Sequence, residues 1–289
     1  MKVLVTGAEG QLGRALIRTA PSDWTIIGLG RSQLDITHEN AVRIAISNTQ
    51  PDIVINAAAY TAVDRAEQEP DLAGNINSNA VRFLVAALQQ TGGRLVQFST
   101  DFVFDGTHYR PYHPNDEPAP LNVYGRSKLE GERIALQQPG NLIIRTAWVY
   151  GVHGANFVKT MLRLMKEREE LRVVADQIGT PTHVNALART TWGLLHASAE
   201  SIFHVTDSGV ASWYDFAVAI QAEALNAGIL ERRIPITPIS SADYPTPARR
   251  PFYGVLDKTE TWMLLGRPAR HWRDELRLMI TELRETNIG

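Results

Sequence analysis

Three glycines near the start of the chain constrain its fold most strongly. The segment VTGAEGQLGRAL places Gly7, Gly10 and Gly13 three residues apart, directly after an apolar run and at the start of a helical pattern. In this context the first glycine permits a tight turn, the second lets the backbone approach a pyrophosphate, and the third lets helix and strand pack closely. The free N–H groups at the start of the helix would bind phosphate. The motif therefore predicts a dinucleotide-binding strand–turn–helix unit.

Apolar, β-branched runs recur along the chain and alternate with helical patterns. We expect strands at 2–5, 25–29, 52–59, 94–100, 141–150 and 201–206, and helices at 11–20, 39–49, 71–91, 123–137, 155–170 and 185–199. Strands that alternate with helices form parallel sheets through right-handed crossovers. Near-continuous apolar strands are typical of a sheet that is buried on both faces. The pattern predicts an α/β fold of the Rossmann type, with a doubly wound parallel sheet.

The alternation weakens after about residue 207, where helices are expected only at 212–226 and 271–284, with a proline-rich segment between them. This change predicts a smaller C-terminal lobe that binds the substrate. We therefore expect an NADP(H)-binding Rossmann domain and a substrate-binding lobe. The domain would comprise 1–150, with 182–206 returning to it, and the lobe would comprise 151–181 and 207–289.

The composition excludes several classes of protein and site. Of the 289 residues, 44% are hydrophobic and 21% are charged, which is typical of an ordinary soluble globular protein. The net charge of −2 gives no general attraction to nucleic acid or anionic membrane, and we find no nucleic-acid motif. The absence of cysteine excludes disulfides and thiolate sites and fits a reducing compartment. Because no signal peptide or membrane span is evident, we expect a cytoplasmic protein without a membrane partner.

The residues at the end of the second expected strand usually determine whether such a protein prefers NAD or NADP. A carboxylate there would bind the ribose 2′-hydroxyl of NAD, whereas an arginine would bind the 2′-phosphate of NADP. Here Gly30 stands at the usual acidic position and Arg31 follows it. This favours NADPH as the cofactor, with NADH possible. The alternative is that Arg31 is only a solvated surface residue.

One tyrosine precedes a lysine by four residues, in LNVYGRSKLEGE at 121–132. Taken alone, Tyr124 and Lys128 could be an i,i+4 pair on a solvated helix face. However, Thr100 ends the fourth expected strand, at the edge of the sheet where ligands bind, and Tyr124 would start the next helix. Lys128 would lower the pKa of Tyr124 and bind the nicotinamide ribose, while Thr100 would orient the substrate oxygen. Tyr124 would then protonate that oxygen as hydride reaches the carbonyl carbon.

This combination resembles the extended branch of the short-chain dehydrogenase/reductase superfamily. Several longer segments are similar to the dTDP-4-dehydrorhamnose reductase family: NAAAYTAVDRAEQEP, FSTDFVFDG, LNVYGRSKLEGE, RTAWVYG, NFVKTML, DQIGTPT and PTPARRP. The resemblance covers nearly the whole chain. It implies NADPH-dependent reduction of the 4-keto group of dTDP-4-dehydro-6-deoxy-L-mannose to dTDP-L-rhamnose, for cell-surface polysaccharide such as the O-antigen of lipopolysaccharide.

The resemblance also implies a role for each residue that matches the family pattern. With the residues already argued from the glycine turn, the second strand and the Tyr–Lys pair, the expected cofactor residues are Gly7, Gly10, Gln11, Leu12, Gly30, Arg31, Asp35, Ile36, Ala57, Ala58, Ala59, Thr61, Ser99, Tyr124 and Lys128. The implied catalytic residues are Tyr124, Lys128 and Thr100, and the implied substrate residues are Thr100, Asp101, Trp148, Asn156 and Arg250.

Three of the substrate residues have equally ordinary structural alternatives. Trp148 would pack on the sugar, but it could be a core aromatic. Arg250 would bind the nucleotide diphosphate, because a guanidinium suits phosphate oxygens, but it could be a surface charge. Asn156 could touch the substrate, or it could cap a helix.

At two places the sequence differs from related enzymes, and these differences bear on the expected reaction and on metal binding. Related dehydratases read Thr-Asp-Glu after the fourth strand, and the acidic pair eliminates water; here Phe102 follows Thr100 and Asp101, which favours a reductase. Some family members are described as dimers bridged by magnesium through glutamates. The corresponding positions here are Ala15 and Asn185, which lack the carboxylates that magnesium prefers. We therefore expect no metal and either a monomer or a metal-free homodimer.

Two other functions remain open at this point. A non-catalytic NADP-binding regulatory subunit would share the fold but would lose the Tyr-x-x-x-Lys pair, which is intact here. A related NDP-4-keto-6-deoxyhexose reductase or epimerase would share the site, and an epimerase would retain its cofactor tightly.

Overall fold

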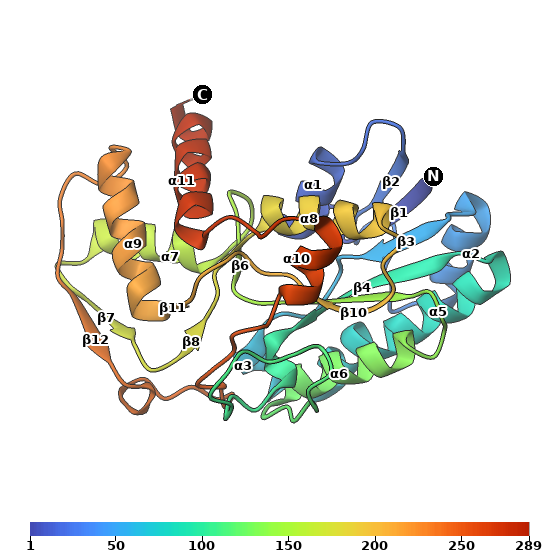
Figure 1. Cartoon of the computed structure of the whole chain (residues 1–289), viewed down its shortest axis with the longest axis horizontal. Helices are drawn as coiled ribbons and strands as arrows, with labels where there is room; N and C mark the ends of the chain where they lie inside the picture. Colours follow the sequence, from blue (N-terminus) through green and yellow to red (C-terminus); the bar gives the residue numbers. More distant parts are fainter. Residues whose placement is uncertain (289) are drawn as a thin grey trace.

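A six-stranded parallel sheet forms the centre of the protein, seen in a computed structural model that describes residues 1–288 (Figure 1). Its strand order is β10-β5-β4-β3-β1-β2. The strands are β1 (Lys2–Thr6), β2 (Thr25–Leu29), β3 (Ile53–Asn56), β4 (Arg94–Thr100), β5 (Leu142–Thr146) and β10 (Ser201–His204). The prediction of an α/β fold with a doubly wound parallel sheet is confirmed. The chain runs from β1 to β2 and then returns to β3 on the other side of β1, so the strand order reverses beside β1, where open α/β sheets bind ligands.

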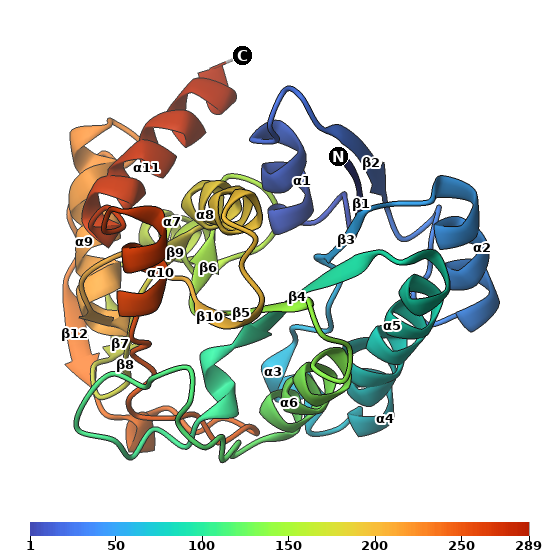
Figure 2. The same cartoon turned by 45° about the vertical axis from the view of Figure 1, so that its right-hand side comes forward.

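Helices cover both faces of this sheet (Figures 1 and 2). One face carries α1 (Gln11–Arg18) and α8 (Val184–His196), and the other carries α2 (Glu39–Thr49), α5 (Ala80–Thr91) and α6 (Val123–Ala135). Side chains along β1 alternate between the two layers: Val3 and Val5 pack with the first, and Leu4 packs with the second. Both layers are apolar, which explains why the strands read as continuous apolar runs.

The helix expected at 71–91 is divided into three parts. These are α4 (Pro70–Gly74), a π-helical turn η1 (Asn75–Asn79) and α5. In the π turn the buried side chain of Asn77 accepts a hydrogen bond from the backbone N–H of Tyr60 and donates to the hydroxyl of Ser127. The Ser127 hydroxyl donates in turn to the carbonyl of Tyr124. The π turn therefore ties α6 to the segment that follows β3.

The strand expected at 141–150 does not continue past Thr146. Trp148 has a φ of 48°, in the left-handed region that is rare for bulky residues. The chain leaves the sheet here, and β6 (Val149–Tyr150) pairs instead with β9 (Thr182–His183). The prediction of one long strand is therefore wrong from Ala147 onward, because the backbone turns into the second lobe.

Most of the other elements lie in the second half of the chain. They are α7 (Phe157–Glu167), β7 (Leu171–Val174), β8 (Ile178–Gly179), β11 (Ala211–Ser212), α9 (Trp213–Asn226), β12 (Ile236–Ile239), η3 (Ser241–Asp243), α10 (Thr259–Leu265) and α11 (Trp272–Ile288). Strand β7 pairs with β12, and β8 pairs with β11. Helices α7, α9 and α11 share an apolar cluster of their own, centred on Phe216, Ile220 and Met279. No helix within residues 1–288 is both long and apolar enough to cross a membrane.

The long segment 104–122 is ordered by contacts with the rest of the protein. The backbone of Tyr112 pairs with Val255 and Asp257 of the C-terminal part. A buried guanidinium, that of Arg145, forms an ion pair with Glu132 at 2.7 Å and donates to the carbonyl of Pro114. These contacts fix the position of the segment that leads into α6.

Candidate active site

The glycine turn lies at the carboxyl end of β1 and packs against the backbone that follows β3. Gly7 has a φ of 63°, and a Cβ built on it would lie 2.7 Å from the backbone nitrogen of Ala58. A Cβ on Gly13 would lie 2.2 Å from the carbonyl oxygen of Gly7. Only glycine fits either position. Because Gly10 caps α1 without a side chain, the first N–H groups of the helix are left for phosphate oxygens.

The end of β2 holds the residues expected to bind the adenosine half of the cofactor. The side chain of Arg31 is 83% exposed, and its guanidinium lies 3.8 Å from a carboxylate oxygen of Asp35. That carboxylate accepts hydrogen bonds from the hydroxyl and the backbone N–H of Thr37, which hold the pKa of Asp35 below its usual value. Ile36 is buried in the layer beneath α2, so its side chain has a packing role as well.

The carboxyl ends of β3, β4 and β5 supply the rest of the dinucleotide cradle. Ala57 and Ala58 are half-buried beside the glycine turn, whereas Ala59 and Thr61 are exposed. The side-chain oxygens of Ser99 and Thr146 are buried and have no hydrogen-bond partner within residues 1–288. Buried hydroxyls normally find a partner, so these two are suited to a bound ligand. The cradle and the unpaired hydroxyls fit a nicotinamide dinucleotide.

The start of α6 brings Tyr124 to the end of β4. The side chain of Asn122 caps the helix by accepting a hydrogen bond from the backbone N–H of Gly125 at 2.8 Å. The N–H of Val123 donates to the carboxylate of Glu67 at 2.7 Å. A Cβ on Gly125 would lie 2.2 Å from the carbonyl oxygen of Phe102, so glycine allows α6 to touch the short helix η2 (Asp101–Val103). Sequence reasoning missed Asn122 and Glu67, although an asparagine before a helical pattern is an N-cap signal.

Tyr124 and Thr100 lie in contact, and Lys128 follows Tyr124 by one turn of α6. Burial raises the pKa of Tyr124 to about 12, while a hydrogen bond with the Thr100 hydroxyl works in the opposite direction. The Lys128 ammonium is buried and donates to the carbonyl oxygen of Phe98 at 2.6 Å, and burial lowers the pKa of this lysine to about 8. The net pKa of Tyr124 in the protein alone is therefore above its usual value, because desolvation is the largest effect on the phenol, and a lowering by Lys128 stays a prediction. At neutral pH the phenol of Tyr124 therefore carries its proton.

Asp101 lies beside the hydroxyl of Thr100. Its carboxylate accepts a hydrogen bond from Thr100 at 3.0 Å, and the residue is 2% exposed. Burial raises the pKa of Asp101 to about 7, so the group carries a proton in part of the molecules at neutral pH. A Cβ on Gly254 would lie 2.5 Å from its other oxygen, so the C-terminal segment closes directly over this carboxyl group.

Trp148 is held in its strained backbone conformation by a second tryptophan. The rings of Trp148 and Trp213 stack with centroids 3.5 Å apart and planes 6° apart. Phe157 packs on the other side of Trp213, at 4.6 Å. A Cβ on Gly179 would lie 2.6 Å from the Trp148 ring, so the absence of a side chain there makes room for the indole. No local sequence signal links Trp213 or Gly179 to Trp148, because these residues lie on three separate elements.

Asn156 and Gln11 connect the two lobes. The Asn156 side chain caps α7 by accepting a hydrogen bond from the N–H of Lys159, and its amide donates to the side-chain oxygen of Gln11 at 2.9 Å. Gln11 donates to the carbonyl of Ala155. The side chain of Asn156 is thus already engaged in capping α7 and in the contact with Gln11. Leu12, which follows Gln11 in the chain, packs on the sheet.

Arg250 lies against the short helix α3 (Val63–Ala66). Its guanidinium forms an ion pair with Asp64 at 2.6 Å and is 23% exposed. The preceding carbonyl, that of Arg249, accepts a hydrogen bond from the side chain of Asn122. The segment 249–250 is therefore tied to both α3 and the start of α6, and sequence reasoning missed Asp64 as the partner.

The positions considered for a metal bridge are occupied by other contacts. Ala15 is buried in the layer between α1 and the sheet. The side-chain oxygen of Asn185 accepts a hydrogen bond from Arg18 at 2.5 Å, and Arg18 also pairs with Glu282. Residues 1–288 contain no group of three or more His, Asp or Glu side chains arranged to hold a metal ion.

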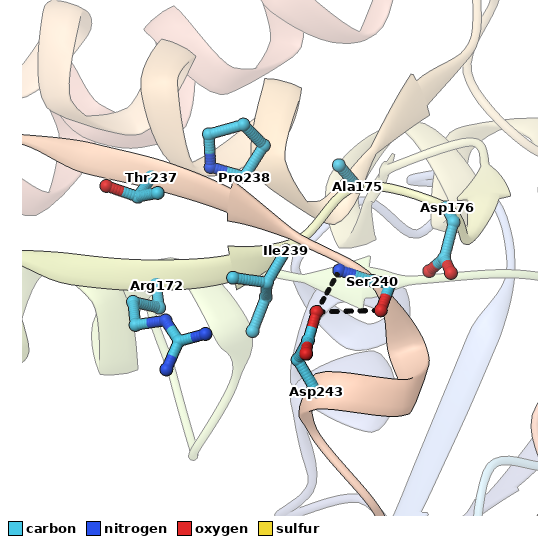
Figure 3. A pocket seen from close by; sticks show the side chains of 8 residues that line it. All are labelled: Arg172, Ala175, Asp176, Thr237, Pro238, Ile239, Ser240 and Asp243. Carbon is cyan, nitrogen blue, oxygen red and sulfur yellow. Dashed lines mark hydrogen bonds between the residues drawn. The ribbon is translucent and has the colours of Figure 1, made fainter.

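A hollow of about 540 Å³ lies over β7 and β12 in the C-terminal lobe (Figure 3). Its lining includes Arg172, Asp176, Ser240 and Asp243. None of the residues predicted for the site lines it, so this hollow does not mark the reaction centre.

Comparison with known proteins gives consistent matches over nearly the whole chain. The family model described as RmlD substrate binding domain matches residues 1–285. The dTDP-4-dehydrorhamnose reductase of Aggregatibacter actinomycetemcomitans is 41% identical over 289 residues, which cover 96% of this chain and 97% of the relative. The crystal structure of dTDP-4-dehydrorhamnose reductase from Bacillus anthracis in complex with NADP is 38% identical, with a TM-score of 0.92 and coverage of 97% and 99%. The structure of such a reductase from Clostridium acetobutylicum is 41% identical, with a TM-score of 0.93 and coverage of 98% and 100%.

Proposed function

The chain belongs to the dTDP-4-dehydrorhamnose reductase family, and from that premise we propose how its residues carry out the reaction. The enzyme is an NADPH-dependent oxidoreductase that reduces the 4-keto group of dTDP-4-dehydrorhamnose to give dTDP-L-rhamnose. One observation of the structure carries the mechanism. The hydroxyl of Thr100 contacts the phenol of Tyr124 at the carboxyl end of β4, and Lys128, one turn further along α6, donates to the carbonyl of Phe98 in the same strand.

Each of the three catalytic side chains has a defined role in the proposed mechanism. Bound NADPH supplies the hydride that reaches C4 of the sugar. Tyr124 donates its phenolic proton to the oxygen at C4, and Thr100 holds that oxygen with its hydroxyl. The buried ammonium of Lys128 stabilises the phenolate that remains on Tyr124 and binds the nicotinamide ribose.

The remaining site residues surround this centre. On the cofactor side we propose Gly7, Gly10, Gln11, Leu12, Gly30, Arg31, Asp35, Ile36, Ala57, Ala58, Ala59, Thr61 and Ser99. On the substrate side we propose Asp101, Trp148, Asn156 and Arg250. The stacked indole of Trp148 supports a role as a platform for the sugar, and the guanidinium of Arg250 would exchange Asp64 for the diphosphate. Residues 1–150 and 182–206 would hold the cofactor, and 151–181 and 207–289 the sugar nucleotide.

The alternative of a non-catalytic regulatory subunit is less well supported. Such a subunit has no need of a buried lysine one helical turn after a tyrosine that contacts a threonine hydroxyl, which is the arrangement of Lys128, Tyr124 and Thr100 here. We also propose that the enzyme works in the cytoplasm and that its product serves cell-surface polysaccharide synthesis. A chain without cysteine fits that reducing compartment.

The activity can be tested directly with the purified protein. We expect dTDP-4-keto-L-rhamnose to be converted to dTDP-L-rhamnose with one NADPH oxidised per sugar, followed by absorbance and identified by NMR. A sugar nucleotide without a 4-keto group, such as dTDP-glucose, is the control and should give no oxidation. If the keto sugar is not reduced by protein that binds NADPH, the proposed function is wrong.

Assembly and metal content form a separate proposal. We propose a monomer or a metal-free homodimer, since Arg18 places a guanidinium beside Asn185 and Glu282 and would repel a cation there. Turnover and molar mass should therefore be the same in EDTA and in excess magnesium, measured by enzyme assay and light scattering. A mass that doubles on adding magnesium, or activity that vanishes in EDTA and returns with magnesium, would contradict this.

A further inference from the structure

Glu9, in the glycine turn, places its carboxyl group over the end of β2. A Cβ built on Gly30 would lie 2.5 Å from the carboxyl carbon of Glu9 and 2.7 Å from its Oε1. The carboxylate of Glu9 therefore occupies the space that a side chain at position 30 would fill. An acidic residue at the end of the second strand binds the ribose 2′-hydroxyl in dinucleotide-binding folds. Here the acid reaches that position from a different turn of the chain.

The backbone around Glu9 is fixed although its side chain is exposed. The N–H of Ala8 donates to the carbonyl of Leu29, the last residue of β2, at 3.1 Å. The carbonyl of Glu9 accepts a hydrogen bond from the side chain of Arg14 at 2.9 Å. The turn is thus joined to the strand on which Gly30 follows. Within residues 1–288 no hydrogen bond or ion pair engages the Glu9 carboxylate, so it is available to a ligand.

The same strand end also carries an available positive charge. Arg31 follows Gly30, is 83% exposed and lies 3.8 Å from Asp35, which is a weak contact. A ribose diol needs hydrogen-bond acceptors, whereas a 2′-phosphate needs a cation and is repelled by a carboxylate. The end of β2 therefore offers one group suited to each of the two cofactors.

We propose that Glu9 is a specificity-determining residue for the cofactor: its carboxylate binds the adenosine ribose hydroxyls of NADH, while Arg31 binds the 2′-phosphate of NADPH. The inference rests on the proposed function, because it assumes that a nicotinamide dinucleotide occupies the glycine cradle. Glu9 has three rotatable side-chain bonds and is exposed, so it can turn toward solvent when a 2′-phosphate enters. The absence of a side chain at Gly30 leaves room for both arrangements.

The test measures cofactor binding without any sugar nucleotide. NADH and NADPH are titrated into the wild-type protein and into Glu9→Gln, Arg31→Ala and Glu39→Gln, with the fluorescence of the reduced nicotinamide as the signal. We expect Glu9→Gln to weaken NADH roughly tenfold or more and to leave NADPH unchanged or bound more tightly. Arg31→Ala should weaken NADPH roughly ten- to a hundredfold with little effect on NADH. Glu39→Gln, which removes one carboxylate from the first turn of α2, is the matched control and should change neither.

The outcomes separate this inference from the proposed function. An equal effect of Glu9→Gln on both cofactors, or none on NADH, would overturn the role of Glu9. Glu9→Asp keeps the charge on a shorter side chain and should retain part of the NADH affinity, which guards against a general effect of the substitution. Because binding is measured without substrate, a protein that fails to reduce dTDP-4-dehydrorhamnose would still show these shifts if Glu9 selects the cofactor.

Discussion

Replacing Tyr124 with phenylalanine should lower turnover by roughly 10²–10⁴-fold, the usual contribution of a general acid. The substitution removes one hydroxyl and keeps the ring that packs edge-on against Phe102 at 5.7 Å. NADPH affinity should therefore change little. Steady-state turnover and nicotinamide fluorescence measure the two quantities independently.

The control for this substitution is Tyr109→Phe, because Tyr109 lies in the 104–122 segment and is 96% exposed. It should leave turnover unchanged. Deuterated NADPH establishes whether hydride transfer limits the rate. If Tyr124→Phe keeps near-normal turnover while a full isotope effect is observed, Tyr124 is not the proton donor.

Replacing Lys128 with methionine should lower turnover by roughly 10²–10³-fold, the loss typical of one preorganised electrostatic contact. Methionine has a similar length and packs in the same space, but it cannot donate to the Phe98 carbonyl or stabilise a phenolate. Unlike Tyr124→Phe, this change should also weaken NADPH, because Lys128 is expected to bind the nicotinamide ribose. Measuring both turnover and NADPH affinity distinguishes the two residues.

The pH dependence of turnover provides a second test of the role of Lys128. Burial lowers its pKa to about 8, so the charged fraction falls tenfold per pH unit above that value. The phenol of Tyr124, with a pKa raised to about 12, stays protonated throughout this range. Wild-type turnover should therefore fall above about pH 8, and the fall should be absent in Lys128→Met. A wild-type profile that stays flat to about pH 10, where a free lysine titrates, would show that the ammonium is not desolvated as the structure indicates.

Much of the architecture could be predicted from the sequence because it depends on short-range periodicity. The apolar runs and helical patterns between them specify β1 to β5 and the helices that cover the sheet, since each needs only a few neighbouring residues. The spacing of Gly7, Gly10 and Gly13 specifies the turn, because no other residue has room beside the Ala58 backbone and the Gly7 carbonyl. The interval between Tyr124 and Lys128 similarly places both on one side of a helix.

Other features were decided only by the tertiary structure, because they depend on residues that meet across the fold. The predicted strand at 141–150 ends before Trp148, whose side chain stacks on Trp213. The local sequence pattern cannot predict this contact, because Trp213 lies far away in the chain. The pKa of Tyr124 rises instead of falling, since desolvation is set by everything packed around the ring.

The end of β2, where the cofactor's adenosine is expected to bind, shows most clearly which features local sequence predicts and which depend on the fold. Gly30 and Arg31 follow β2 directly in the chain, so the absence of an acid at the end of that strand could be predicted from local sequence. Only the folded chain decided that the carboxylate of Glu9 lies there instead. The physical reason is that a side chain's chemistry is local, whereas its position depends on which strands become neighbours, and β1 and β2 become neighbours only in the sheet.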